Sequence, residues 1–235
     1  MLVKVDAQQL EWRVAAWLSN DQTAIREILE KIDFHEENQH TFGLPSRLIA
    51  KIYLFRTIFR GSGYAFSVDP QFMHVSDSPE FWDEVGRKFY KKYNGLDRWH
   101  NQLARLSASR RPIVSPLGRE WLVLPKDDGK LRWTVFTNYP VQGTGADLMM
   151  IARLSLARRL RAANSKALLI STVHDDIKLD VPDSETEFVT EMALQVFDDL
   201  PKNVKAIFGV DLPIPFSGEA FIGRDLLNME KYVRH

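Results

Sequence analysis

Hydrophobic residues recur at helical spacing along most of the chain. In the segment 10–18 they fall at i, i+4, i+7 and i+8, the spacing of one apolar helix face: Leu10, Val14, Trp17 and Leu18. The same pattern predicts helices over five further segments: 25–32, 46–60, 80–106 with a break near Asn94-Gly95, 142–163 and 184–208. Asp21 or Thr23 is expected to cap the first of these five, and Ser46 the second. The segment 64–80 has no such pattern and is expected to be irregular surface chain.

Apolar runs with alternating or continuous patterning predict strands between the helices. Six segments fit: 2–5, 120–125, 131–136, 167–173, 177–181 and 210–222. The second and third flank a turn, and the fourth and fifth flank His174-Asp175-Asp176, so each pair predicts a hairpin. Pro213 and Pro215 favour an edge position for the last strand. Because strands come in hairpins and helices in separate runs, we expect an α+β fold.

Composition narrows the function classes. Of 235 residues, 45% are hydrophobic and 26% charged, which is enough apolar side chain to bury a core. Lys and Arg number 31, as do Asp and Glu, so a globally basic nucleic-acid binder is excluded, whereas a locally basic groove is not. Without cysteine, disulfides, zinc-thiolate sites and a cysteine nucleophile are excluded. No apolar run reaches membrane-helix length and no signal peptide is evident, so we expect a cytoplasmic chain without membrane contact.

Three aspartates mark the ends of predicted strands. Asp6 ends the first strand, and Asp175 and Asp176 lie at the tip of the hairpin over 167–181. Carboxylates brought together repel unless a cation bridges them, and Mg²⁺ binds through one or two carboxylates plus substrate phosphates. Two such ions can clamp the oxygens of a phosphoryl transfer. Aspartate is also common in turns, so position alone leaves a purely structural role open.

The predicted helix over 46–60 carries a stripe of ordered chemistry. Its members, four residues apart, are Arg47, Lys51, Phe55 and Phe59. Cations followed by rings suit a nucleoside triphosphate lying along the helix, with charges at its phosphates and a ring near its base or sugar. The alternative is a solvated basic turn followed by an aromatic stripe that faces the core. Arg56 and Arg60 form a neighbouring row suited to a nucleic-acid backbone.

These clusters occur in an order found in one protein family. The sequence resembles the family A DNA polymerases, the bacterial DNA polymerase I family, and its phage-type members most. The segments that carry the resemblance are Asp6–Val14 (motif A), Asp33-Phe34-His35, Arg47–Phe59 (motif B), Asn138–Asp147, Val173–Asp176 (motif C) and Gly218-Glu219. Together they span the chain from residue 3 to the C-terminus.

The resemblance implies a polymerase palm, an antiparallel sheet with helices, and mainly helical fingers. Residues 1–20 and 131–235 would be palm, with the motif C hairpin at 167–181. Residues 21–130 would be fingers, with the nucleotide-binding helix at about 46–60. In the family a thumb and any 3′–5′ exonuclease domain precede motif A, which opens this chain. We therefore expect a split polymerase, in which a second polypeptide supplies the thumb, with or without an exonuclease.

The resemblance also implies roles for single residues. Asp6, Asp175 and Asp176 would hold two Mg²⁺ ions while the primer 3′-hydroxyl attacks the α-phosphate of a dNTP. Lys51 would also be catalytic, as a proton donor to pyrophosphate. The residues implied to contact the dNTP are Glu11, His35, Arg47, Lys51, Phe55 and Phe59. The residues implied to contact primer–template DNA are Arg56, Arg60, Arg132, Asn138, Gln142 and His174.

Three positions depart from the family pattern. Phe59 stands where motif B has a Tyr whose hydroxyl can hold the steric-gate Glu, here Glu11, which excludes a ribose 2′-hydroxyl. We therefore expect Glu11 to be less firmly placed and sugar discrimination to be weaker. Asp176 replaces the usual Glu of motif C, and Thr134 replaces an Arg whose role falls to Arg132.

The expected function is that of a DNA-directed DNA polymerase, acting in the host cytoplasm if the chain is phage-encoded. One alternative is a non-catalytic DNA-binding or assembly module derived from a polymerase, which the intact acidic and basic residues argue against. A second is a magnesium-dependent nuclease or nucleotidyl phosphatase. Such an enzyme has no use for Arg47 and Lys51 at this spacing.

Overall fold

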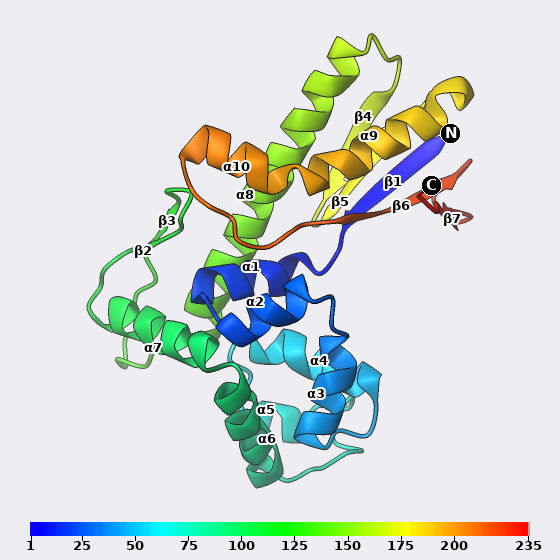
Figure 1. Ribbon diagram of the computed structural model, residues 1–235. Helices are drawn as coiled ribbons and strands as arrows, with labels where there is room; N and C mark the ends of the chain where they lie inside the picture. Colours follow the sequence, from blue (N-terminus) through cyan, green and yellow to red (C-terminus); the bar gives the residue numbers. More distant parts are fainter. Residues whose placement is uncertain (235) are drawn as a thin grey trace. The chain divides into compact units, whose positions relative to one another are not determined.

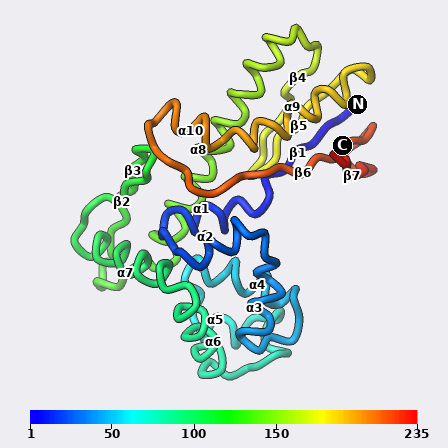
Figure 2. The backbone as a smooth tube through the Cα atoms, in the orientation of Figure 1, coloured from blue at the N-terminus to red at the C-terminus, as the bar shows by residue number. Residues whose placement is uncertain are grey.

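The computed structural model describes residues 1–234, which form two compact units. Unit 1 comprises Met1–Leu10 and the residues from Thr144 onward, and unit 2 comprises Glu11–Gly143. The chain thus contributes one strand to unit 1, builds all of unit 2, and then completes unit 1, as the colours of Figures 1 and 2 trace. These boundaries lie about ten residues from the palm and fingers boundaries expected above, and the palm and fingers assignment itself stays a prediction.

The elements follow one another in the order that Figure 1 labels. They are β1 (Leu2–Ala7), α1 (Leu10–Ser19), α2 (Gln22–Leu29), α3 (Phe34–Phe42), α4 (Arg47–Thr57), α5 (Gly63–Ser67), α6 (Pro79–Lys92), α7 (Asn94–Ala108), β2 (Ile113–Val114), β3 (Glu120–Trp121), α8 (Trp133–Ala162), β4 (Leu168–Val173), β5 (Asp176–Asp180), the 3₁₀ turn η1 (Asp183–Glu185), α9 (Thr186–Asp198), α10 (Leu200–Phe208), β6 (Gly218–Gly223) and β7 (Glu230–Lys231). None of these helices is both long and apolar enough to cross a bilayer. The helices and the antiparallel sheet together confirm the expected α+β fold.

Unit 1 is built on an antiparallel sheet in the order β4-β5-β1-β6-β7. Side chains of β1 alternate, so that Val3 and Val5 are buried while Lys4 and Asp6 lie on the opposite face. Helix α9 covers the apolar face over β1 and β6, as Figure 1 shows. The packing there is close, because a Cβ added at Gly218 would lie 2.9 Å from the Phe197 ring.

Unit 2 is mainly helical and has an aromatic core. Nine aromatic side chains in it are at most 2% exposed: Trp12, Phe42, Tyr53, Phe66, Phe72, Trp82, Phe89, Tyr93 and Phe136. The Phe66 ring is central, with centroids 4.8 Å from Tyr53, 5.0 Å from Phe72 and 5.5 Å from Trp82. Tilted and edge-on pairs at these separations stabilise a core beyond the area that they bury.

Asp21 joins two helices of unit 2 from a buried position. One carboxylate oxygen accepts from the backbone N–H of Ala24 at 2.9 Å, which caps α2. The other accepts from the N–H groups of Gly95 and Leu96, at 2.6 and 3.1 Å, in the first turn of α7. A Cβ at Gly95 would lie 2.6 Å from the Asp21 Cα, so this close approach requires glycine. Of the two predicted caps of α2, Asp21 is therefore the correct one.

Two predicted strands are wrong in the region before residue 140. Residues 133–136 are helical, because α8 begins at Trp133, and only Glu120–Trp121 of 120–125 forms a strand. The reason is visible in the burial of the following residues. Phe136, Thr137, Pro140, Val141 and Thr144 are buried at helical spacing, so a short alternating run is absorbed into a long helix that carries Pro140 inside it.

Three further expectations need correction. The segment 64–80 is not surface chain, since it contains α5 and the buried rings of Phe66 and Phe72. The helix predicted over 184–208 is divided at Asp199, where Pro201 in the first turn starts α10. The last strand begins only at Gly218, after both prolines, and lies between β1 and β7 rather than at an edge.

Replacing the buried cap should cost more than replacing an exposed one. Asp21→Ala leaves three buried N–H groups without their acceptor, and we expect it to lower the free energy of unfolding by about 2–4 kcal/mol. Ser46→Ala, which removes one bond to the Ile49 N–H at the start of α4, should cost about 1 kcal/mol. Urea unfolding of both variants measures the difference, and equal losses would contradict the double-cap role.

Candidate active site

Four carboxylates gather at one end of the sheet in unit 1. Asp6, near the end of β1, is paired in register with Asp176 on β5 and with Glu219 on β6. Asp175 lies in the tight turn between β4 and β5, and its backbone oxygen accepts from the Ala7 N–H at 2.8 Å. That bond ties the hairpin tip to the end of β1. The sheet therefore brings Asp6 together with Asp175 and Asp176, which lie more than 160 residues later in the sequence.

The electrostatics of this cluster centre on Asp6. Burial raises the pKa of Asp6, and the negative charges of Asp175, Asp176 and Glu219 raise it further, partly offset by Lys4 at 3.7 Å. An acid destabilised in its charged form by neighbouring acids is stabilised by a nearby cation. A bound cation would therefore stabilise the ionised form of this carboxylate cluster.

Besides the Lys4–Asp6 pair, two other carboxylates of the cluster have a lysine partner. Lys178 donates to both oxygens of Asp176 at 2.5 Å, and both side chains are largely buried. Lys231 donates to Glu219 at 2.6 Å, and this hydrogen bond lowers the pKa of Glu219. Within residues 1–234, Asp175 has no ion pair. Sequence reasoning missed Lys178, although the alternation of residues 176–180 puts it on the same sheet face as Asp176.

The carboxylates of this cluster offer magnesium two ligands rather than a complete coordination sphere. Across residues 1–234 no three His, Cys, Asp or Glu side chains form a group that could hold a metal ion. The available set is the pair Asp6 and Asp175, since Asp176 is bound to Lys178. Mg²⁺ is usually bound by one or two carboxylates together with water and substrate phosphates, so such a pair matches its needs when a nucleotide is present.

In unit 2 the predicted stripe on α4 lies outside the core. The buried face of α4 is formed by Ile49, Ala50, Tyr53, Leu54 and Thr57. Lys51 is exposed, and Phe55 and Phe59 are half-buried. The reading of the stripe as a core-facing one is therefore wrong.

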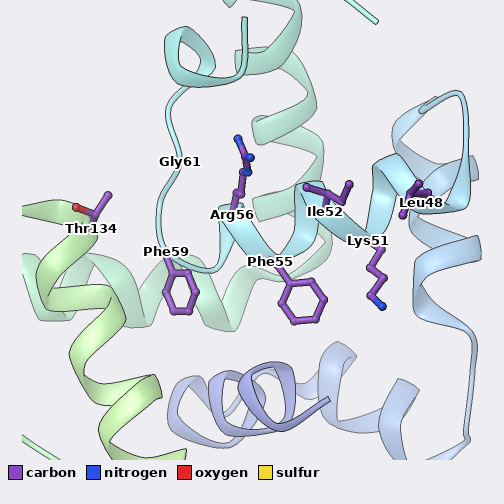
Figure 3. A pocket seen from close by; sticks show the side chains of 8 residues that line it. All are labelled: Leu48, Lys51, Ile52, Phe55, Arg56, Phe59, Gly61 and Thr134. Atoms are coloured by element: carbon purple, nitrogen blue, oxygen red, sulfur yellow. The ribbon is translucent and has the colours of Figure 1, made fainter. Parts of the chain in front are cut away.

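A cavity of about 580 Å³ lies along the side of α4 that carries Lys51 and Phe55. It is lined by Leu48, Lys51, Ile52, Phe55, Arg56, Phe59, Gly61 and Thr134. Figure 3 shows Lys51, Phe55 and Phe59 extending from one side of the helix, whereas Arg56 points to the other. An ammonium group followed by two accessible rings is suited to a charged ligand that also has a flat, apolar part.

Arg47 and His35 have partners of their own. Arg47 donates to Asp33 at 2.8 Å, and Asp33 in turn caps α3 through the N–H groups of His35 and Glu36. His35 is buried, with its ring 4.3 Å from that of Phe34 and 6.1 Å from that of Phe55. Burial, with a smaller effect of Arg47, lowers the pKa of His35 to about 4. His35 is therefore neutral at pH 7 and contributes no positive charge.

Arg56 and Arg60, predicted to contact DNA, are engaged within unit 2. Arg56 pairs with Asp69 and lies over the Phe72 ring, 5.0 Å from its centroid. Arg60 donates to Asp97 at 3.2 Å, and its guanidinium is 4.7 Å from the ring centroids of both Tyr90 and Trp133. These contacts give both arginines a structural role that the sequence pattern did not predict.

The other predicted DNA contacts differ in exposure. Arg132, His174 and Gln142 are exposed, and Asn138 is half-buried. His174 has a positive φ of 54°, which shapes the turn before Asp175. Gln142 donates through its amide to the Glu11 carboxylate, a contact between two residues that the resemblance assigns to different ligands.

Comparison with known proteins decides the family. The family model described as "DNA polymerase family A" matches residues 1–225. The chain belongs to DNA polymerase family A. It is 27% identical over 240 residues to "DNA polymerase I, thermostable" of Thermus aquaticus, covering 98% of this chain and 27% of that protein. It is 22% identical over 194 residues to DNA polymerase theta of Caenorhabditis elegans, covering 81% of this chain and 12% of that protein.

A solved family member has a similar fold. It is described as the POL domain of Pol1 from M. smegmatis in complex with DNA primer-template and dNTP. The match has a TM-score of 0.78 at 19% identity, and it covers 95% of this chain and 39% of that one. This chain thus spans about a quarter of the length of the bacterial polymerase I relatives that it matches.

The Arg60 cluster should contribute to stability more than a typical surface ion pair. Arg60→Met removes the bond to Asp97 and the contacts with two rings, and should lower the free energy of unfolding by about 1–2 kcal/mol. Arg87→Met is the matched control, because Arg87 makes an exposed pair with Glu84 and should change stability by less than about 0.5 kcal/mol. Urea titrations that give the same loss for both would contradict the structural role of Arg60.

Proposed function

We propose that this chain is the catalytic portion of a DNA-directed DNA polymerase that adds dNTPs to a primer 3′-hydroxyl by two-metal phosphoryl transfer. The observation that carries the proposal is the carboxylate cluster, in which Asp6 and Asp175 meet at the end of a family A sheet. Unit 1 would correspond to the palm and unit 2 to the fingers.

Each carboxylate has a defined part in this proposal. Asp6 and Asp175 hold the metal site, and two Mg²⁺ ions, when bound, stabilise the attacking and leaving oxygens. Asp176 acts less as a ligand than as the partner of Lys178, which keeps one negative charge of the cluster neutralised. This division suits a site that must bind divalent ions without accumulating four unpaired acids.

The cavity side of α4 would bind the incoming nucleotide. Arg47 and Lys51 contact the triphosphate, and Lys51 donates a proton to the pyrophosphate as it leaves. Phe55 packs against the sugar and the nascent base pair, and Phe59 extends the same apolar surface. His35 stays neutral and supports the ring of Phe55 rather than binding phosphate by charge.

Other residues of the chain would contact the primer–template DNA and the sugar of the nucleotide. Asn138, Gln142, Arg132 and His174 contact primer or template, and Glu11 acts as the steric gate against a ribose 2′-hydroxyl. The M. smegmatis relative is described in complex with DNA primer-template and dNTP, which are ligands of the same two kinds. Contacts with the DNA backbone along the duplex would come from a thumb outside these 235 residues, either in the same protein or in a second polypeptide.

The metal role of Asp175 can be tested directly. Asp175→Ala should reduce magnesium-dependent primer extension by about a thousandfold or more while the circular dichroism spectrum is unchanged. Asp180→Ala is the matched control, because Asp180 is an exposed aspartate at the far end of β5, the strand that follows Asp175. Extension that survives in Asp175→Ala would exclude the metal role. Absence of extension in the unaltered chain, together with its partners, would favour the non-catalytic DNA-binding module.

The nucleotide role of α4 has its own test. Lys51→Ala should weaken magnesium-dependent dNTP binding by about tenfold or more, since it removes a cation from the triphosphate site. Lys88→Ala, which changes an exposed lysine on α6, should leave dNTP affinity unaltered. Fluorescent-nucleotide titration measures both affinities. Equal affinities in the two variants would argue for the nuclease reading, in which α4 does not bind a triphosphate.

A further inference from the structure

We infer that Gln142 positions Glu11 for sugar discrimination, replacing the hydroxyl that Phe59 lacks. The inference rests on the proposed function, in which Glu11 is the steric gate. Its observation is the hydrogen bond from the Gln142 side-chain amide to the Glu11 carboxylate, two residues 131 positions apart in the sequence. Gln142 is thus a positioning residue as well as a DNA contact.

Both ends of this bond are held by separate packing within unit 2. Next to Glu11, the Trp12 side chain is 1% exposed, and its ring centroid lies 5.5 Å from that of Phe34 and 5.0 Å from that of Tyr93. This packing fixes the rotation of α1 at Glu11. The bond therefore does not depend on a freely turning helix.

On the other side, α8 is fixed next to Gln142. Val141 is buried, and a Cβ added at Gly143 would overlap the indole ring of Trp121. Gln142 lies between buried Val141 and closely packed Gly143. Its own side chain is exposed, and its amide donates to Glu11. The contact joins two elements with little freedom to separate.

The chemistry of the pair matches the missing function. An ionised carboxylate is an acceptor only, so Glu11 needs a donor, and the ring of Phe59 has none. The Gln142 amide supplies a charge-assisted N–H bond, of the kind a tyrosine hydroxyl would otherwise make. Its second N–H and its carbonyl oxygen stay available for a base edge. On this inference Glu11 has a donor despite Phe59, and the expectation of a loosely placed Glu11 stays a prediction for the test below.

Selectivity between dNTP and rNTP tests the inference. The measured quantity is the ratio of kcat/KM for the two sugars in magnesium-dependent primer extension by the full chain with its natural partners. Gln142→Met keeps side-chain length but removes the donor, and the ratio should fall about fivefold, mainly through a lower KM for rNTP. Asn138→Leu, one turn earlier on α8, should lower extension with both sugars and leave the ratio unchanged.

Rescue separates positioning from DNA contact. In the Gln142→Met background, Phe59→Tyr should return the ratio to within about twofold of the unaltered chain, because the new hydroxyl can hold Glu11. In the unaltered background the same change should have little effect on the ratio. A Gln142→Met variant that loses both activities equally, or a ratio that Phe59→Tyr does not restore, would overturn the inference.

A readout without catalysis distinguishes this inference from the proposed function. The side-chain amide resonance of Gln142 should move in Glu11→Leu, and an amide that does not move contradicts the inference itself. A second outcome is that the resonance moves but the unaltered chain with its partners extends no primer. The proposed function is then wrong and so is the role in sugar selectivity, whereas the Gln142–Glu11 contact is confirmed.

Discussion

The pairing of β1 is the constraint on which the candidate site depends. Six residues at the start of the chain pair on one side with β5 and on the other with β6. Because side chains alternate along a strand, a slip of one residue would move Asp6 to the apolar face and bring Val5 among the acids. The burial of Val3 and Val5 beneath α9 sets this register, and so the apolar face determines where the Asp6 carboxylate lies.

Charge within the site is distributed rather than simply accumulated. Lysines pair with Asp176 and Glu219 at 2.5 and 2.6 Å, and Lys4 lies farther from Asp6, at 3.7 Å, so that among residues 1–234 Asp175 is the acid of this cluster without an ion pair. In unit 2 the charges on α4 are likewise partly paired. Arg47 forms an ion pair with Asp33 and Arg56 with Asp69, whereas Lys51 has no ion pair among residues 1–234. Each unit thus keeps a small number of charges available for a ligand and uses the others to hold its own fold.

Much of this could be predicted from the sequence, and the failures have clear causes. Helices with a strong apolar face, the motif C hairpin and the cap at Ser46 follow from local patterns and were predicted correctly. The strand predicted at 131–136 failed because a six-residue window does not include the buried positions that continue the helix to Ala162. The contacts of Arg60 and Gln142 depend on partners brought together by the tertiary fold, and no local pattern reveals such partners. Lys178 is different, because its partner Asp176 lies two residues away on the same strand face.

The discontinuous composition of unit 1 has a consequence for how the protein forms during synthesis. Unit 2 is one uninterrupted stretch, so its aromatic core can close once residue 143 has left the ribosome. Strand β1 is made before unit 2, yet its partners β5 and β6 are made after it. Until then β1 is an unpaired apolar strand, which is a hazard for association with other chains. The loop that must close around it is more than 160 residues long, which places the formation of the acidic cluster among the latest events of folding.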